Sequence, residues 1–231
     1  MASKIKTAQE AIAGLEDGMS VMIGGFMATG TPEILIDAII EKGVKHLTVI
    51  CNDGGLPKGW YNDYDTARGT GKLLEAGVID HLIASHVGLT PLVGKGVIEG
   101  TMKCTLIPQG SLVEKIRAGN FGLGGFLTPT GLGTVAAEGK MQIEVDGKMY
   151  VLEKPLRADY SLCRASVCDE FGNLLCSKTT KNFNYLMIGA ADHNIIATER
   201  LVKVGELDPD VFQHSGVLVD TIVEGEKPWQ I

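Results

Sequence analysis

The part of this sequence with the clearest chemical potential is a glycine-rich loop between a predicted strand and a predicted helix. Residues 20–23 form a short apolar run of strand type, and residues 24–30 follow it with glycine at three positions. Glycine permits left-handed backbone angles and close approaches that a side chain would prevent. Thr31 suits an N-cap and Pro32 a first helical residue. Backbone N–H groups at such a junction can bind an anion or a carbonyl oxygen, although glycines in a βα turn can also merely reverse the chain.

Two amide side chains, Asn52 and Gln109, follow predicted strands over residues 47–51 and 104–107. In an open α/β sheet, ligands bind beyond the carboxyl ends of the strands, so Gln109 should lie at the same edge as the glycine-rich loop. His86 follows another predicted strand and either lines this edge or is a structural polar residue. Taken alone, Gln109 is interpreted as an exposed loop residue, because polar residues are abundant in loops.

Other catalytic and metal-binding motifs are incomplete or missing in this sequence. Residues 68–72 resemble part of a phosphate-binding P-loop, but Thr66 and Leu73 stand where a glycine and a Ser or Thr are needed. The five histidines have no metal-ligand spacing, and the five cysteines form no Cys-x-x-Cys pair. The cysteines lie mostly in apolar segments, which indicates small buried core residues. We therefore expect no metal site and no tightly bound cofactor.

Strand and helix patterns alternate along the chain, as in an open, mostly parallel α/β sheet with flanking helices. Capping boxes predict a helix over residues 7–17 and a second one that begins at Ser111 and leaves Gln109 in the loop before it. A further helix over residues 32–42 should end at Gly43. Strands are expected at 20–23, 47–51, 81–85, 104–107, 160–165, 174–177, 195–198 and 217–222, completing a mixed sheet.

A small antiparallel element should interrupt this pattern. Asp146-Gly147 between two apolar-alternating runs predicts a hairpin, so we expect a single domain over residues 1–231 with a β-rich hairpin insertion near 139–156. The Gly-, Thr- and Pro-rich stretch over residues 119–133 carries interleaved apolar residues and is too long for a simple connection, which suggests burial under a partner.

Composition restricts the class of protein. The chain is 45% hydrophobic and 21% charged, which is typical of a globular domain with a sizeable core. A net charge of −7 argues against nucleic acid or an anionic membrane as a partner, because an acidic surface gains no counterion release from either. The polar start and the absence of a bilayer-length apolar run favour a cytoplasmic protein.

The sequence resembles the alpha chain of the family I coenzyme A transferases, and within that family the alpha subunits of the acetate- and butyrate-acetoacetate type. The spacing of Asp-Gly, three apolar residues, Gly-Gly-Phe, Gly and Pro from Asp17 to Pro32 matches the family's signature. Further matching segments fall in the family's order at residues 50–53, 83–88, 108–114, 122–131, 155–159 and 181–184.

The resemblance implies nucleophilic catalysis with coenzyme A as a substrate. In this family a glutamate of the beta chain attacks an acyl thioester, giving an acyl-glutamyl anhydride and then a glutamyl-CoA thioester. Its Ser-Glu-x-Gly context is missing here, and Glu33, Glu114 and Glu144 suit helix ends or a hairpin strand. We therefore expect a CoA-transferase that is active only with a beta subunit carrying the catalytic glutamate, in an α2β2 assembly acting on acyl-CoA and acetoacetate, acetate or butyrate.

The resemblance also assigns roles to residues. Gln109, in the Pro-Gln-Gly segment, matches the amide that stabilises the oxyanion, and Asn52 is placed to orient the catalytic carboxylate or the acyl group. The segment that corresponds to the family's CoA-binding loop consists of Gly24, Gly25, Phe26, Met27, Ala28, Thr29 and Gly30.

One segment departs from the family, and two other functions stay open. Residues 54–65 are longer and more aromatic than in close members, so Trp60, Tyr61 and Tyr64 either reshape the acyl pocket or form a surface loop that packs on itself. The alternatives are a non-catalytic ligand-binding domain of the same architecture and a subunit that only scaffolds the beta chain.

Overall fold

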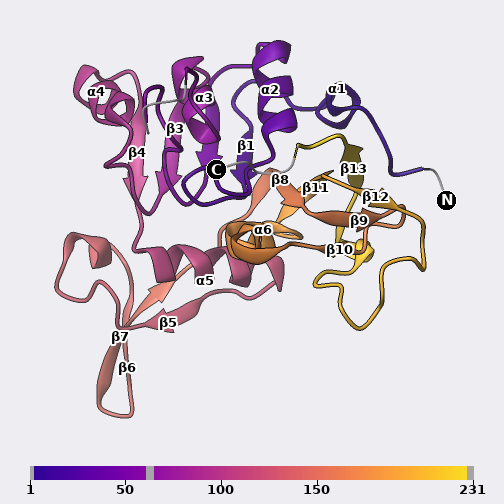
Figure 1. The fold of residues 1–231 in the computed structure, drawn as a ribbon. Coiled ribbons are helices and arrows are strands. Elements are labelled where there is room, and N and C mark those ends of the chain that lie inside the picture. The colour runs from indigo at the N-terminus through magenta and orange to yellow at the C-terminus, as the bar shows by residue number, and fades with distance from the viewer. Residues whose placement is uncertain (1–2, 61–64, 228–231) are drawn as a thin grey trace.

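A seven-stranded sheet forms the centre of the computed structural model, which describes residues 3–60 and 65–227 (Figure 1). The strand order is β13-β11-β8-β1-β2-β3-β4, and the neighbouring strands are paired in parallel. The bounds are β1 (Ser20–Ile23), β2 (Leu47–Ile50), β3 (Ile79–Ala84), β4 (Lys103–Leu106), β8 (Ala158–Ala165), β11 (Ala191–Thr198) and β13 (Thr221–Glu224). The expected open, mostly parallel α/β sheet is confirmed.

Helices cover both faces of this sheet (Figure 1). On β1, Val21 and Ile23 belong to one hydrophobic core and Met22 to the other, because successive side chains of a strand point to opposite faces. The first core includes α1 (Ala8–Ala11), α2 (Glu33–Lys42), α3 (Thr70–Glu75) and α4 (Pro91–Glu99), and the second includes α5 (Gln109–Asn120) and α6 (Asn182–Met187).

Two three-stranded sheets flank the main one. The strand predicted over residues 174–177 lies outside the main sheet, because Leu174 and Leu175 pair antiparallel with residues 167–168. Residues 217 and 218, expected to begin a strand, belong instead to a short 3₁₀ helix over Gly216–Leu218. One small sheet contains β10 (Leu174–Leu175), β9 (Val167–Asp169) and β12 (Leu201–Val202); the other contains β5 (Phe126–Thr128), β7 (Lys148–Glu153) and β6 (Gln142–Val145). Two more 3₁₀ helices span Val135–Ala137 and Lys178–Lys181.

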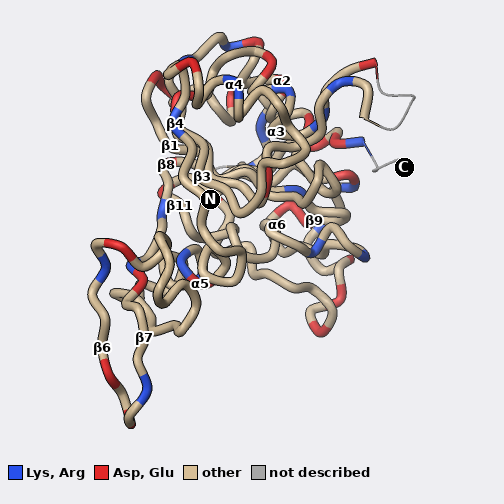
Figure 2. The backbone as a smooth tube through the Cα atoms, turned by 90° about the vertical axis from the view of Figure 1, so that its left-hand side faces the viewer, with Lys and Arg blue, Asp and Glu red and all other residues tan. Residues whose placement is uncertain are grey.

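The predicted hairpin forms between β6 and β7. Asp146 and Gly147 make the turn with φ of 50° and 75°, the positive values that a type I′ turn requires. The hairpin extends away from the main sheet and carries charges of both signs (Figure 2). Nearby, Phe121 is 69% exposed, and Leu123 and Leu127 are also exposed, so residues 3–60 and 65–227 leave these apolar side chains uncovered.

Helix ends follow the prediction at some positions and not at others. Gly43 ends α2 in the left-handed conformation, and the Thr7–Glu10 capping box is present. The first helix is shorter than expected, ending at Ala11, because Lys42 Nζ binds the carbonyl oxygens of Ile12 and Ala13 at 2.9 and 2.5 Å. The Lys42 ammonium thereby replaces the next turn of helix.

Two predicted caps are wrong. Thr31 does not cap α2, because its single hydroxyl hydrogen is directed between the Ala28 carbonyl and the Glu33 carboxylate, whose oxygens lie 2.8 and 2.6 Å from Oγ1. The box predicted at Ser111 does not form either, because α5 already begins at Gln109, directly after Pro108. Ser111 is therefore inside the helix and buried, and its hydroxyl has no hydrogen-bond partner among the described residues.

A buried ion-pair cluster joins the β5–β7 sheet to α5. Glu153 on β7 is 2% exposed, and its carboxylate receives Lys115 Nζ of α5 at 3.0 Å and Lys140 Nζ at 2.5 Å. Burial raises the pKa of Glu153, but the hydrogen bonds from Lys140 and Lys115 outweigh it, so the pKa is lowered. Within the described part of the chain, no helix is long and apolar enough to cross a bilayer.

Replacing Glu153 with Gln should reduce the free energy of unfolding by roughly 2 kcal/mol near neutral pH, since two charge-assisted hydrogen bonds are lost. Because the folded-state pKa is lowered, the stabilisation is complete above the ordinary glutamate pKa of about 4.3 and disappears as pH falls through the folded value. Urea unfolding at pH 7 and below pH 4 measures this difference. Glu144→Gln, on the exposed face of β6, is the control; an equal loss in both variants would contradict the assignment.

Candidate active site

The structure brings the two predicted amides together at the carboxyl edge of the main sheet. Asn52 follows β2 and Gln109 is the first residue of α5, which itself follows β4. Gln109 Nε2 donates a hydrogen bond to Asn52 Oδ1 at 2.6 Å. Asn52 is 2% exposed, whereas Gln109 is exposed, so the hydrogen bond joins a buried amide to a residue at the surface.

Asp53, which the sequence analysis did not single out, connects these amides to the glycine-rich loop. Its carboxylate accepts the Met27 N–H at 2.7 Å, Asn52 Nδ2 at 2.6 Å and the Gly55 N–H at 2.8 Å, and it is 6% exposed. The available signal was an Asn-Asp pair followed by Gly-Gly directly after a strand, because a buried carboxylate at a strand end needs nearby backbone donors.

The loop itself is a tight turn with an unusual backbone. Phe26 and Thr29 exchange backbone hydrogen bonds of 3.1 and 2.8 Å. Between them, Met27 and Ala28 have φ of 46° and 62°, which non-glycine residues rarely adopt. Each such residue costs on the order of 1 kcal/mol, so the surrounding contacts must hold the turn in this conformation.

Two asparagines in the first turn of α6 supply part of that support. Asn182 Nδ2 donates to the Thr29 carbonyl at 2.9 Å, and Asn184 Nδ2 donates to the Gly30 carbonyl at 2.7 Å. A Cβ on Gly24 would lie 1.9 Å from Asn184 Oδ1, so this glycine is required by the packing of Asn184. Gly25 is required by its backbone, whose φ is 117°.

The backbone donors of the loop divide into two groups. Gly24, Phe26, Met27 and Thr29 use their N–H groups in hydrogen bonds within the chain. For residues 25, 28 and 30, the described residues provide no acceptor for the N–H. The predicted supply of donors is therefore reduced to these three positions. Phe26 is the exposed side chain of the loop.

The space enclosed between the loop and the Asn52-Asp53 pair is small. A cavity of about 10 Å³ lies there, lined by Gly25, Ala28, Asn52 and Asp53 among others. Such a volume holds at most one water molecule. A substrate would therefore bind outside it, on the side where Gln109 and Phe26 are exposed, and would need a second surface to enclose it.

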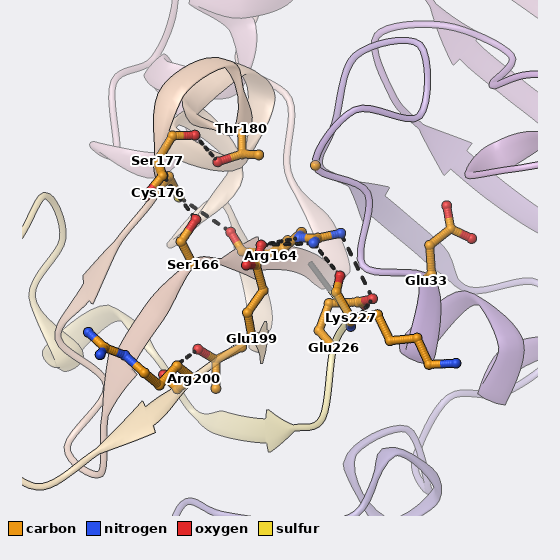
Figure 3. A network of polar contacts seen from close by, with 12 residues as sticks. Glu33, Arg164, Ser166, Cys176, Ser177, Thr180, Glu199, Arg200, Glu226 and Lys227 are labelled. Carbon is orange, nitrogen blue, oxygen red and sulfur yellow. Dashed lines mark hydrogen bonds and ion pairs between the residues drawn. The ribbon is translucent and has the colours of Figure 1, made fainter. Parts of the chain in front are cut away.

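A second polar network lies behind the loop and is centred on Arg164 (Figure 3). Arg164 is 1% exposed; its guanidinium donates to Glu199 at 2.8 and 3.0 Å, to the Thr31 carbonyl at 3.3 Å and to the Lys227 carbonyl. Glu226 lies 3.9 Å from it. The network thereby ties the C-terminal segment to the end of the glycine-rich loop.

The network around Arg164 also provides the N-terminal cap of α2 that Thr31 does not provide. The Glu226 carboxylate accepts the Ile34 N–H of α2 at 3.0 Å. Burial raises the pKa of Glu226, partly offset by that hydrogen bond and by Arg164. A cavity of about 450 Å³ adjoins the network, and Lys72 on its wall pairs with Glu33 and Asp37 at 2.8 and 2.7 Å. We interpret this region as the anchor of α2.

The remaining candidates can be placed as follows. Four cysteines are buried, and burial raises the pKa of their thiols, which confirms their interpretation as core residues; they are Cys51, Cys163, Cys168 and Cys176. His86 is exposed and pairs with Asp53 as an extension of the β2–β3 ladder. Of the aromatic loop, Tyr61 and Tyr64 lie outside the described residues. Among residues 3–60 and 65–227, no group of His, Cys, Asp and Glu could hold a metal ion.

Comparison with known proteins identifies the family of this chain. A family model described as coenzyme A transferase matches residues 5–225. The chain is 45% identical to the acetate CoA-transferase subunit alpha of Escherichia coli K12, covering 98% of this chain and 99% of the relative. It is 42% identical to the acetoacetyl-CoA:acetate/butyrate CoA transferase alpha subunit of Clostridium acetobutylicum, covering 97% and 99%.

A solved structure shares the fold. The acyl-CoA transferase of Escherichia coli O157:H7, determined as a thioester complex with CoA, superposes with a TM-score of 0.80 at 21% identity. The match covers 96% of this chain and 47% of that protein, so this chain spans about half of its length. The resemblance noted in the sequence is confirmed: the chain belongs to the coenzyme A transferase family, as an alpha subunit.

Proposed function

We propose that this chain is the alpha subunit of a short-chain CoA transferase that moves CoA between an acyl-CoA and acetoacetate, acetate or butyrate. The observation that carries the proposal is the outward-facing amide of Gln109, held by Asn52 beside the glycine-rich loop. The names of the two alpha-subunit relatives supply the substrate class. One or two methylenes change binding by only ~1–3 kcal/mol, so the class is set at the level of short acids.

In this proposal the nucleophile comes from a beta subunit. Its glutamate carboxylate attacks the thioester carbonyl, the electron pair moves to the carbonyl oxygen, and CoA leaves as a thiolate to give an anhydride. The thiolate then attacks the glutamyl carbonyl, releases the first acid and forms a glutamyl-CoA thioester, from which the acceptor acid takes CoA by the reverse steps. Negative charge develops on oxygen at each attack, and Gln109 donates an N–H to it.

The other residues of the site serve binding and orientation. Asn52 orients Gln109 directly, and the loop from Gly24 to Gly30 receives part of CoA on its outer side, where Phe26 is exposed. The exposed apolar residues near Phe121 suit contact with the partner. We further infer an α2β2 assembly in the cytoplasm and a single domain over residues 1–231.

The reconstituted activity tests the whole proposal. This chain alone should show no acyl exchange above background, because it lacks the attacking carboxylate, and mixing with the beta subunit from the same organism should restore exchange between acetyl-CoA and acetoacetate. Exchange by the unmixed chain would contradict the proposal. A stable mixed complex without exchange would favour a scaffold subunit.

Replacing Gln109 with Ala should lower kcat by roughly 10²–10³-fold in the assembled enzyme, the usual cost of removing one oxyanion donor. Assembly, followed by light scattering, should be unchanged because the Gln109 side chain is exposed. Gln142→Ala, an exposed glutamine of β6, is the matched control and should retain full activity. A wild-type rate in the Gln109 variant would remove its proposed role.

CoA binding should slow deuterium exchange in the segment from Gly24 to Gly30, because a ligand would cover the side of the loop on which Phe26 is exposed. Mass spectrometry of the assembled enzyme with and without CoA measures this effect. Residues 167–175, in the small sheet of β9 and β10, provide an internal reference that should not change. Unchanged exchange in the loop would mean that it does not receive CoA.

A further inference from the structure

The Asp53 carboxylate can only accept hydrogen bonds, and this sets the direction of the hydrogen bonds in the site. An ionised carboxylate has no donor, and three donors converge on the one at Asp53: two backbone N–H groups and the Asn52 amide nitrogen. Asp53 Oδ2 takes the Met27 N–H and Asn52 Nδ2, while Oδ1 takes the Gly55 N–H. The Asn52 amide is therefore held with its nitrogen toward Asp53.

The orientation of the Asn52 amide also determines the group that its oxygen faces. With Nδ2 directed at Asp53, Asn52 Oδ1 points the other way, where it accepts Ser85 Oγ at 3.1 Å and Gln109 Nε2 at 2.6 Å. An amide group has a donor side and an acceptor side, and its partners determine which side faces which neighbour. Because Asn52 is 2% exposed, water does not compete for these contacts.

Gln109 is the last member of the series. One hydrogen of Nε2 is directed at Asn52 Oδ1, which leaves the second hydrogen of the same nitrogen in a defined direction. If the Asn52 amide were reversed, its NH₂ would face Gln109, and Gln109 would have to turn its oxygen inward. The donor of Gln109 would then move to the other side of the group.

From this geometry we infer that Asp53 is a positioning residue, which acts through Asn52 to fix the direction in which Gln109 presents its amide hydrogen. The inference rests on the oxyanion role proposed for Gln109. The same carboxylate binds the Met27 N–H in the strained turn of the glycine-rich loop. Asp53 thus holds the CoA loop and the oxyanion donor in one arrangement.

The variant Asp53→Asn keeps the shape of the side chain and changes its polarity. In one orientation its NH₂ opposes the Met27 and Asn52 donors, and in the other it opposes the Gly55 N–H, so only one of its two orientations still holds Asn52, and that one gives up the Gly55 hydrogen bond. In the assembled enzyme we expect kcat to fall roughly tenfold to a hundredfold, because a misplaced catalytic group costs about that much. The KM for acetyl-CoA should change less than threefold.

A double-mutant cycle with Gln109→Ala separates positioning from a general structural effect. If Asp53 acts through Gln109, Asp53→Asn should lower kcat in the wild-type background and change it less than twofold once Gln109 is alanine. An equal loss in both backgrounds, or no loss in either, would overturn the inference while leaving the role of Gln109 intact. A wild-type rate for Gln109→Ala alone would overturn both.

Two further variants keep the test decisive. Asn52→Leu interrupts the same series at its middle, and it should show the same dependence on Gln109 if Asp53→Asn does not assemble; an independent loss would again overturn the inference. Asp169→Asn is the matched control, because Asp169 is equally buried and accepts three backbone N–H groups between Phe171 and Asn173. It should lower thermal stability and leave kcat unchanged.

Discussion

The Asp53 carboxylate is the contact on which the arrangement of the site depends. A buried carboxylate is unfavourable unless donors surround it, and here those donors come from the loop after β1 and from residues adjoining Asp53 itself. The parallel sheet makes this possible, because β1 and β2 are neighbours whose carboxyl ends reach the same edge. The hydrogen bonds that compensate the desolvation of Asp53 therefore also order the loop after β1 and the loop after β2.

The glycine-rich loop shows how such order is maintained. Met27 and Ala28 adopt left-handed backbone angles at a cost of about 1 kcal/mol each. Asp53, Asn182 and Asn184 each contribute a hydrogen bond to the loop backbone, worth roughly 1 kcal/mol apiece. These contributions offset the strain. The loop is thus held in a single shape before any ligand binds, which reduces the entropy lost on binding.

The sequence was informative where local pattern and tertiary environment agree. The parallel strands, the hairpin at Asp146-Gly147 and the end of α2 at Gly43 all have short-range signals that the fold retains. For Asn52 and Gln109, the sequence predicted only that both residues lie near the same edge of the sheet, not that they form a hydrogen bond. Its direction depends on Asp53, whose donors include a residue 26 positions earlier in the chain.

Each of the two wrong caps has an identifiable physical cause. Threonine is a common N-cap residue, which favoured Thr31. The Glu226 carboxylate, from near the other end of the chain, instead accepts the N–H of Ile34 in the first turn of α2. Ser111 and Glu114 have capping-box spacing, but α5 begins earlier, at Gln109 directly after Pro108, so Gln109 is in its first turn. A contact distant in sequence in the first case, and a proline three residues upstream in the second, outweigh a local preference worth about 1 kcal/mol.

Under the proposed function, the geometry of the isolated chain also explains why the chemistry needs a second subunit. Gln109 presents a donor to a surface, the cavity behind it holds at most one water, and the apolar residues around Phe121 are exposed. An oxyanion donor is effective where water is excluded, since water would screen the charge and compete for the hydrogen bond. A partner that brings the nucleophile to this edge would also cover it. Separating donor and nucleophile on two chains therefore confines the reactive geometry to the assembled enzyme.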